Sequence, residues 1–491
     1  MLSRSARSAL RPIKMTLRAK INPNMLPALA RNNSSASSSS PSDADDVLFA
    51  PNRAIRTITL NRPAKLNSLN QSMVDKIIPR MVEWTKSDTA QSIILKGAGN
   101  KALCAGGDVA ALANDIAQNG PEGSARSTVF FKDEYTLNHL IASYPKPYIA
   151  VMNGITMGGG VGLSVHAPFR IATEKTLFAM PETDIGFFPD VGGSFFLSRL
   201  DGQIGTYLAL TSARLKGYDA VAAGIATHYI PESLLPDVES RLAEVFVDSV
   251  APIDAHSLVN SVLLEFETAA PEGYVFSLSG KARESIDAAF SNKTVEDIVA
   301  ALEADGSDIA KSALKAILSR SPTAVKVTLA ALRRGETLGI KDALDAEYRL
   351  AENFMYGHEF VEGVSAKLIS KPARTPEWKP ATLQEVTPDI VNGYISNRPD
   401  SVVQDIEFIH PENNFTKYPH TFGLPSEQQI KDYVLGNDNP DREFKVSAQE
   451  VHEHFDNITR GKLGVHQKID DIIVRMTKPD PTDVQLLDWI Y

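Results

Sequence analysis

The sequence predicts an α/β fold followed by a helical C-terminal part, and two observations carry that prediction. From Val47 to about Ile230, short runs rich in β-branched residues alternate with stretches of helical periodicity. After Pro231 the strand signals fade, and helical segments follow one another. Alternation of this kind is typical of repeated strand–strand–helix or strand–helix units. At 491 residues the chain is too long for a single core, so we expect more than one domain.

The individual elements are predicted from residue type and period. Strands are expected where β-branched and aromatic residues cluster, at 54–60, 91–96, 147–154 and 169–173. Helices are expected at 72–84, 132–143, 281–290, 295–303, 309–319, 322–334, 340–354 and 359–369. Two of the later helices carry start signals: Thr294 with Asp297 resembles a capping box, and Ser321 precedes a proline in the first turn.

The first 42 residues have a composition of their own. They contain seven arginine and lysine residues, no acid, and the serine-rich tract SSASSSSPS. This composition is typical of a mitochondrial transit peptide, and a basic tail with another purpose is the alternative. Without these seven positive charges the net charge would move from −10 to −17, which argues against direct binding of nucleic acid.

Composition and motifs exclude several other classes of protein. No run of 18 apolar residues occurs, so no membrane-spanning helix is expected. The single cysteine, Cys104, excludes an internal disulfide and the cysteine-based zinc sites. There is no G-x-S-x-G, H-E-x-x-H, P-loop or EF-hand motif. GAGNKA at 97–102 fits a dinucleotide fingerprint, but the long helix that should follow it is missing.

Two glycine clusters are candidates for binding an anionic oxygen. CAGGD (104–108) and MGGGVGLSVHA (157–167) each follow a predicted strand and precede a helix. Such turns expose backbone N–H groups, and a helix N-terminus adds a partial positive charge. Two such turns brought together could direct two N–H donors at one oxygen, as an oxyanion hole requires. A tight turn without further function is the alternative for either cluster.

Carboxylates are the remaining candidates for chemistry. Glu134 lies in FKDEYTLNHL, and Glu182, Asp184 and Asp190 lie in AMPETDIGFFPDVGG, whose apolar residues predict burial. An unpaired buried charge costs several kcal/mol. Either each carboxylate therefore has a structural partner, or burial tunes some of them for catalysis.

Five ordered segments resemble the crotonase (enoyl-CoA hydratase/isomerase) superfamily. They are LNRPAKLNSLN, ALCAGGD, GITMGGGVGLS, FAMPETDIGFFPDVGG and LTSARLKGYDAVAAGIATHYIP, and the resemblance covers residues 48 to about 390. It implies a spiral of ββα repeats completed by a helical part, and an acyl-CoA ligand. We therefore expect a transit peptide and linker at 1–42, an acyl-CoA-binding core at 43–255, a helical part at 256–380, and an extension of unknown role at 381–491.

Within that superfamily the segments are most similar to the branch that hydrolyses 3-hydroxyisobutyryl-CoA in mitochondrial valine breakdown. The resemblance implies an oxyanion hole made of the backbone N–H groups of Gly107 and Gly159. It implies that Glu182 is the general base or the nucleophile, and that Asp190 orients the substrate hydroxyl or assists proton transfer. Glu134 falls on an acyl-binding position, and Gly159, Glu182 and Asp190 are implied to contact substrate as well. LNRP and the segment leading into CAGGD would line the path of CoA.

Two positions depart from the functional pattern of the superfamily. Asp184 matches no functional position, so we expect a solvated or paired side chain. Gly162 occupies the position where the hydratases carry a second catalytic glutamate. Hydration needs an acid and a base on either side of a double bond, so this glycine argues against it.

The resemblance thus implies a thioester hydrolase of the mitochondrial matrix, with no metal or redox cofactor and no particular oligomeric state. Two alternatives stay open. One is an enoyl-CoA hydratase or isomerase. The other is a component of the mitochondrial small ribosomal subunit that retains the crotonase fold, a role known for fungal relatives of this branch. Because no chemical motif lies beyond Pro380, we expect the extension to be dispensable for catalysis.

Overall fold

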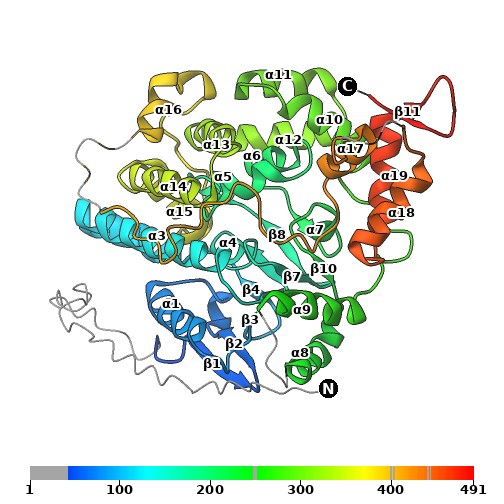
Figure 1. Cartoon of the computed structure of the whole chain (residues 1–491). Coiled ribbons are helices and arrows are strands. Elements are labelled where there is room, and N and C mark those ends of the chain that lie inside the picture. The colour runs from blue at the N-terminus through cyan, green and yellow to red at the C-terminus, as the bar shows by residue number, and fades with distance from the viewer. Residues whose placement is uncertain are drawn as a thin grey trace, which may run out of the picture. The chain divides into compact units, whose positions relative to one another are not determined.

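The β-branched runs of the first half form the larger of the two sheets that this half contains in the computed structural model (Figure 1). Its strands, in spatial order, are β1 (Val47–Asn52), β2 (Ile55–Leu60), β3 (Ser92–Gly97), β5 (Tyr148–Met152), β7 (Phe169–Ala172) and β10 (His228–Tyr229). β1 and β2 are antiparallel, and the other neighbours pair in parallel. Parallel strands are usually covered on both faces and are therefore apolar along their length; all five residues of β5 are buried.

The structure describes residues 43–246, 252–396, 398, 401, 404–439, 442 and 444–490. The expected transit peptide lies outside these residues. Asp45–Tyr491 form one compact unit.

Along the chain, strands of the smaller sheet alternate with strands of the larger one. Its strands, in spatial order, are β4 (Ala102–Cys104), β6 (Ile155–Met157), β8 (Leu177–Ala179) and β9 (Leu215–Lys216). β4, β6 and β8 each follow a strand of the larger sheet, so the chain adds one strand to each sheet in turn. This is the expected spiral of ββα units. With two or three residues each, these strands are too short for their residue pattern to predict them.

Helices follow the strand pairs and cover the sheets. They are α1 (Gln71–Thr85), α2 (Val109–Asn119), α3 (Pro121–Ala142), α4 (Gly159–Gly162), α5 (Gly193–Phe196), α6 (Ile204–Thr211), α7 (Asp219–Ala222), α8 (Leu235–Val245) and α9 (Pro252–Phe266). Short 3-10 turns occur at η2 (Pro63–Lys65), η3 (Glu182–Ile185), η4 (Leu197–Arg199) and η5 (Glu232–Leu234). The helix expected at 132–143 is the second half of α3. Its first half is buried through small residues such as Gly123, Ser124 and Ser127, which give no apolar period.

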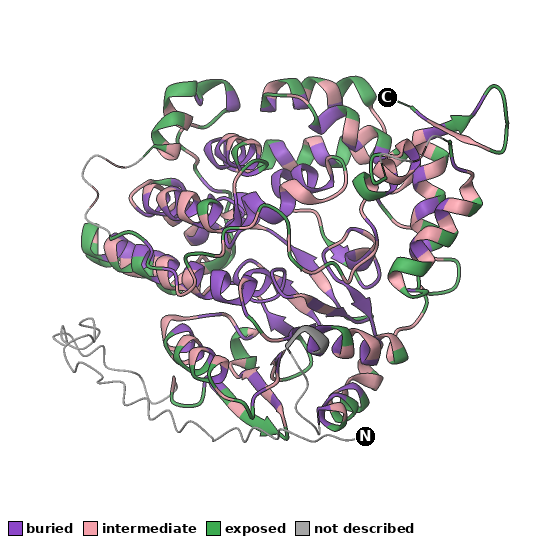
Figure 2. Cartoon of the chain, in the orientation of Figure 1, coloured by how far each residue is buried: buried purple, intermediate pink, exposed green. Residues whose placement is uncertain are grey.

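The larger sheet separates two hydrophobic cores. Along β3, Ile93 and Leu95 belong to the main core, whereas Ile94 faces a second core formed with α8 and α9. Successive strand residues point to opposite faces, so a single strand supplies both cores. Figure 2 shows buried residues concentrated in the strands and on the inner sides of the surrounding helices.

The helical part contains α10 (Gly280–Phe290), α11 (Val295–Asp305), α12 (Asp308–Ser319), α13 (Pro322–Gly335), α14 (Ile340–Met355) and α15 (Glu359–Val364), which continues as a π turn, η6 (Ser365–Ile369). Both predicted start signals are confirmed. The hydroxyl of Thr294 accepts a hydrogen bond from the N–H of Asp297, and that of Ser321 accepts one from the N–H of Ala324. None of the helices among the described residues is both long and apolar enough to cross a membrane.

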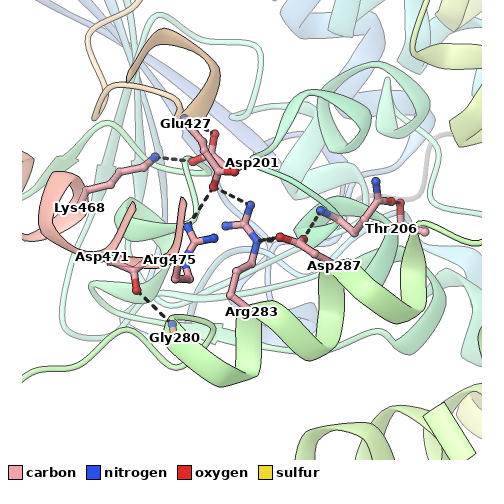
Figure 3. A network of polar contacts seen from close by, with 10 residues as sticks. Asp201, Thr206, Gly280, Arg283, Asp287, Glu427, Lys468, Asp471 and Arg475 are labelled. Atoms are coloured by element: carbon pink, nitrogen blue, oxygen red, sulfur yellow. Dashed lines mark hydrogen bonds and ion pairs between the residues drawn. The ribbon is translucent and has the colours of Figure 1, made fainter. Parts of the chain in front are cut away.

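The C-terminal extension packs against the rest of the chain. It contains η7 (Leu383–Glu385), α16 (Pro388–Ile395), α17 (Glu427–Leu435), α18 (Ala448–Thr459), α19 (Val465–Met476), β11 (Thr477–Pro479) and β12 (Leu487–Trp489). Figure 3 shows the charged contacts by which it docks: Glu427 pairs with Arg283 of α10 at 3.0 Å, and Arg475 of α19 holds Glu427 from within the extension, also at 3.0 Å. Lys468 pairs with Asp201 at 2.7 Å. Breaking buried pairs of this kind is strongly destabilising, so these contacts fix the extension on the core.

Candidate active site

The two glycine turns predicted from the sequence come together at one edge of the smaller sheet. β4 and β6 are parallel neighbours, so the turns that follow them lie at the same edge. A Cβ atom placed on Gly159 would lie 3.3 Å from the backbone nitrogen of Gly107. Gly159 begins α4, where backbone N–H groups have no partner within the helix. Within the described residues, neither Gly107 nor Gly159 donates its N–H to an acceptor, which leaves two unpaired donors on adjoining turns.

The close approach of α4 to the end of β4 leaves no room for a side chain larger than that of glycine. A Cβ on Gly160 would lie 2.2 Å from the carbonyl oxygen of Cys104, which is far inside van der Waals contact. Gly158 has φ +47°, in the left-handed region that other residues rarely adopt. The triple glycine therefore lets α4 begin directly against the end of β4.

The acids Glu134, Glu182 and Asp190 surround this turn. A Cβ on Gly158 would lie 2.8 Å from Oε1 of Glu182, and one on Gly159 would lie 2.5 Å from Oε1 of Glu134. All three carboxyl side chains belong to residues that are at most 5% exposed. Among the described residues, Oε1 of Glu134 and Oε2 of Glu182 have no hydrogen-bond partner. The structure thus brings together three of the four acids that the sequence singled out, beside the two unpaired N–H groups.

Burial dominates the ionisation of these acids. It raises the pKa of Asp190 to about 7, and the hydrogen bond from Tyr135 opposes that rise. Burial, and then the charge of Asp190, raise the pKa of Glu134 and of Glu182 well above the ordinary value. Adjacent carboxyl groups cannot all be ionised at neutral pH, so the cluster holds at least one proton. A site with both a carboxylic acid and a carboxylate can donate and accept protons.

Asp184 is the acid of this segment that forms ion pairs with basic side chains among the described residues. It pairs with Arg320 at 2.8 Å and with Lys367 at 3.1 Å. Glu182 and Asp184 belong to the same short turn, η3, yet only the first lies in the buried cluster. The expectation of a solvated or paired Asp184 is confirmed.

Gly162 faces a space that is already filled. A Cβ at this position would lie 2.6 Å from Cβ of Val191 and 2.8 Å from Nδ2 of Asn138. Asn138 is buried one helical turn beyond Glu134, and both of its amide atoms are without a partner in the described part of the chain. The position where hydratases carry their second glutamate cannot hold a longer side chain here without movement of its neighbours.

The loop that carries Asp190 is strained and tightly held. Val191 has φ +53°, a conformation that a β-branched residue adopts at a cost of about 1–3 kcal/mol. Glu347 of α14 accepts hydrogen bonds from the N–H of Gly192 at 2.7 Å and of Ser194 at 2.8 Å. Burial raises the pKa of Glu347 to about 8. Strain that is held in place by such contacts is typical of functional sites.

Sequence reasoning missed Tyr135, Asn138, His166 and Glu347. Tyr135 donates a 2.7 Å hydrogen bond to Oδ2 of Asp190, and His166 contacts the carbonyl of Val191 at 2.7 Å. The only available signal was position, because Tyr135 and Asn138 lie on the same helix as Glu134, one and four residues beyond it.

Ion pairs and hydrogen bonds hold the loop that begins with LNRP (60–63) beside the first glycine turn, CAGGD. Arg62 and Lys65 both contact Oδ2 of Asp108, at 2.9 and 2.8 Å. The side-chain amide of Asn67 donates to the carbonyls of Ala98 and Ala102, just before CAGGD. The two segments expected to line the path of CoA therefore lie side by side, with the exposed Lys65 at their outer edge.

Aromatic side chains form apolar walls around the cluster. Phe131 stacks on Phe187 with ring centroids 5.2 Å apart, and the ring of Phe130 lies 3.5 Å from where Gly107 would carry a Cβ.

Neither a cysteine nucleophile nor a metal centre is found among the described residues. Burial raises the pKa of the Cys104 thiol to about 12, so this cysteine is not a thiolate nucleophile. In the part of the chain that the structure describes, no group of three or more His, Cys, Asp or Glu side chains could hold a metal ion.

Residues 55–395 match the family model described as enoyl-CoA hydratase/isomerase. Over 448 residues the chain is 46% identical to the small ribosomal subunit protein mS47 of Neurospora crassa, with 88% of this chain and 86% of the relative covered. Over 349 residues it is 46% identical to the mitochondrial 3-hydroxyisobutyryl-CoA hydrolase of Gallus gallus, with 71% and 88% covered. A carnitinyl-CoA dehydratase from Mycobacterium thermoresistibile is similar in structure, with a TM-score of 0.65 and 36% identity over 74% of this chain and 99% of that one.

Proposed function

Because the chain belongs to the enoyl-CoA hydratase/isomerase family, we propose that it hydrolyses a CoA thioester, with 3-hydroxyisobutyryl-CoA as substrate. The observation that carries this proposal is the cluster of Glu134, Glu182 and Asp190 beside the unpaired N–H groups of two glycine turns. The filled space at Gly162 supports hydrolysis over hydration, because it leaves no room for a second glutamate. The hydrolase name of relatives that are 42–46% identical supports the choice of substrate.

In the first form of the mechanism, Glu182 is a general base. Its carboxylate takes a proton from water while the water oxygen bonds to the thioester carbon. The carbonyl oxygen becomes an oxyanion that accepts hydrogen bonds from the N–H groups of Gly107 and Gly159. When the C=O bond re-forms, the C–S bond breaks, and the CoA thiolate takes up the proton. The products are the carboxylic acid and free CoA.

In the second form, an oxygen of Glu182 attacks the thioester carbon itself. The C–S bond breaks, the CoA thiolate takes a proton from Asp190, and an anhydride with Glu182 remains for water to hydrolyse. Repeated turnover in ¹⁸O-labelled water tests the second form. Label in the peptide that contains Glu182 requires an anhydride that water attacks at the glutamate carbon, whereas label in the acid product alone is the outcome both of general-base catalysis and of attack at the acyl carbon of the anhydride.

Asp190 and Glu134 would act beside Glu182. Asp190 would orient the 3-hydroxyl of the acyl group or exchange a proton with the leaving thiolate, a role that its pKa of about 7 suits. Glu134 would fix the acyl group next to Gly159. The phenylalanine walls would exclude bulk water, which strengthens the hydrogen bonds to the oxyanion.

The direct test is a panel of acyl-CoA esters read by release of free thiol. Cys104 is the only cysteine and is fully buried, so a thiol reagent added to the folded protein reports CoA alone. We expect the highest kcat/KM for 3-hydroxyisobutyryl-CoA and none of the hydration of crotonyl-CoA that a hydratase would catalyse. Hydration of crotonyl-CoA without release of thiol from any ester would overturn the proposal.

A second function, membership of the mitochondrial small ribosomal subunit, is favoured by one observation. The match to mS47 covers 88% of this chain, and the extension from residue 381 onward makes up more than a fifth of it. The match therefore includes part of the extension. Co-sedimentation of the tagged full-length protein with mitochondrial small subunits tests this function, and recovery only in the soluble fraction at low salt would contradict it. The names of the relatives support a mitochondrial location, and we propose the matrix.

A further inference from the structure

The part of the extension before α17 crosses the catalytic half of the chain. Residues 404–425, here called the strap, form the orange segment without helices that leads to α17 in Figure 1. Ile406 and Phe408 of the strap are buried in the main core, and Phe422 stacks on Phe169 of β7. Its backbone also binds the core: the carbonyl of Phe415 accepts a hydrogen bond from the N–H of Ile340.

One strap side chain reaches toward the loop that carries Asp190. The hydroxyl of Tyr418 lies 2.7 Å from Nδ1 of His166, and Nε2 of the same ring lies 2.7 Å from the carbonyl oxygen of Val191. His166 and Val191 are buried, and Tyr418 is half-buried with its ring packed edge-on against Phe195. A chain of two hydrogen bonds therefore links the extension to the residue next to Asp190.

Chemistry sets the direction of both hydrogen bonds. A carbonyl oxygen can only accept, so Nε2 of His166 carries the proton that it donates to Val191. Burial lowers the pKa of His166 to about 4, so the ring is neutral and Nδ1 has no proton. Nδ1 must then accept from Tyr418, whose pKa is raised by burial. The carbonyl of Val191 thus fixes the tautomer of His166, and the hydroxyl of Tyr418 stabilises it by donating to Nδ1.

His166 also belongs to the segment that forms the oxyanion turn. It lies seven residues beyond Gly159, just after α4. The hydrogen bond to Val191 therefore ties the turn that carries the Gly159 N–H to the loop that carries Asp190. It also supports Val191 in its left-handed conformation, together with the contacts of Glu347 to the following residues.

We propose that Tyr418 is a positioning residue for catalysis. Acting through His166, it holds the loop that carries Asp190 at a fixed position relative to the Gly159 turn. The proposal rests on the proposed thioester chemistry of this site. It replaces the expectation from sequence that the extension is dispensable, because the strap supplies one end of the hydrogen-bonded chain. A displacement of about 1 Å at a catalytic group can lower turnover by about 10²-fold.

The first experiment removes one atom. Tyr418→Phe keeps the ring packing and deletes the hydroxyl, so we expect kcat for 3-hydroxyisobutyryl-CoA to fall by roughly 10-fold while KM stays within about twofold. Tyr433→Phe is the matched control, because its hydroxyl contacts the carbonyl of Glu450 and the side chain of Arg442, both inside the extension. Wild-type kcat for Tyr418→Phe would overturn the proposal.

The second experiment separates positioning from packing by changing His166. His166→Gln places an amide N–H where Nε2 lies and can still donate to Val191, whereas His166→Asn reaches only the position of Nδ1. We expect the glutamine variant to keep clearly more kcat than the asparagine variant at matched melting temperature. Equal losses in the two variants would show that His166 acts through packing alone.

A readout that does not depend on activity completes the test. In the full-length protein with ¹⁵N-labelled histidine, we expect the His166 ring to show the neutral tautomer protonated at Nε2, and Tyr418→Phe to shift its Nδ1 resonance. An unchanged His166 spectrum in Tyr418→Phe would contradict the proposal. If the wild-type protein released no thiol from any ester, the proposed function would fail, but the spectrum would still report whether Tyr418 donates to Nδ1 of His166.

Discussion

Tyr135 donates a 2.7 Å hydrogen bond to Oδ2 of Asp190 across 55 positions of the sequence. The residue before it, Glu134, lies in the same buried cluster, and burial, followed by the charge of Asp190, raises the pKa of that glutamate. Two consecutive residues of α3 are therefore coupled to Asp190 in different ways. Tyr135 stabilises the ionised form of Asp190, and the ionised Asp190 in turn disfavours ionisation of Glu134.

Tyr135→Phe should move the pH dependence of activity. Loss of the phenol removes the hydrogen bond that stabilises ionised Asp190, so the pKa of Asp190 rises above its value of about 7. If ionised Asp190 is the active form, the rise of kcat/KM with pH shifts to higher pH. Tyr144→Phe is the control, because its hydroxyl donates to the carbonyl of Met81 outside the site. An unshifted profile in Tyr135→Phe would remove Asp190 from the chemistry.

Glu182→Gln should abolish most turnover and leave binding intact. The amide keeps the shape of the side chain but has neither basicity nor nucleophilicity, so we expect kcat to fall by about 10²–10⁴-fold. Binding of a non-hydrolysable CoA ester, measured by calorimetry, should change little. Asp184→Asn, two residues away and paired with Arg320, is the matched control and should keep near-normal kcat. Near-normal turnover in Glu182→Gln would exclude both forms of the mechanism.

Gly162→Glu should not create a hydratase. The new side chain would have to displace Val191 and Asn138, since its Cβ would lie 2.6 and 2.8 Å from their atoms. Gly162→Ala already overpacks the site, and we expect it to lower the free energy of unfolding by about 1–3 kcal/mol. Denaturant unfolding measures the cost, and absorbance of crotonyl-CoA measures hydration. Efficient hydration by the glutamate variant would show that one residue separates the two activities.

Asp190 and Glu347 should each lower the free energy of unfolding as pH rises. Burial raises the pKa of Asp190 from 3.8 to about 7 and that of Glu347 from 4.5 to about 8. Between these values each group binds more protons in the folded than in the unfolded protein, so it lowers stability with increasing pH, by at most about 1.4 kcal/mol per pH unit. His166, whose pKa burial lowers from 6.5 to about 4, acts in the opposite direction between those two values, so the contribution of Asp190 is read from the difference between wild type and variant. Asp190→Asn should flatten the decline between pH 4 and 7. Denaturant midpoints at pH 5 and 8 measure it, and parallel curves for both proteins would contradict the prediction.

The N-terminal segment should be removed in mitochondria. A basic, serine-rich segment without acids suits import, so we expect cleavage before Asp43. Mass spectrometry of the N-terminal peptide from isolated mitochondria identifies the first residue. A mature protein that begins at Met1 would show that this segment has another purpose.

Asp190→Asn should discriminate between substrates. If Asp190 binds the 3-hydroxyl, the loss in kcat/KM should be larger for 3-hydroxyisobutyryl-CoA than for isobutyryl-CoA, which lacks that group. Thiol release from the two esters measures the ratio. Equal losses would assign Asp190 to proton transfer rather than to substrate recognition.

Much of the fold was predictable because its signals are local. β5 is a run of apolar residues that are all buried, and the caps at Thr294 and Ser321 act within three residues of their own position. The smaller sheet escaped prediction because strands of two or three residues have no measurable period. Its existence depends on pairing with strands that are distant in the sequence.

The order of motifs along the chain is enough to predict the candidate site residues: two glycine turns and the acids Glu134, Glu182 and Asp190. What surrounds each of these residues follows from the folded chain. Glu182 and Asp184 look alike in the sequence, yet only Asp184 meets Arg320, 136 residues away. Tyr418 meets His166 across 252 residues. Such contacts depend on how distant segments of backbone are placed, whereas residue type and periodicity report only on the neighbouring turns of the chain.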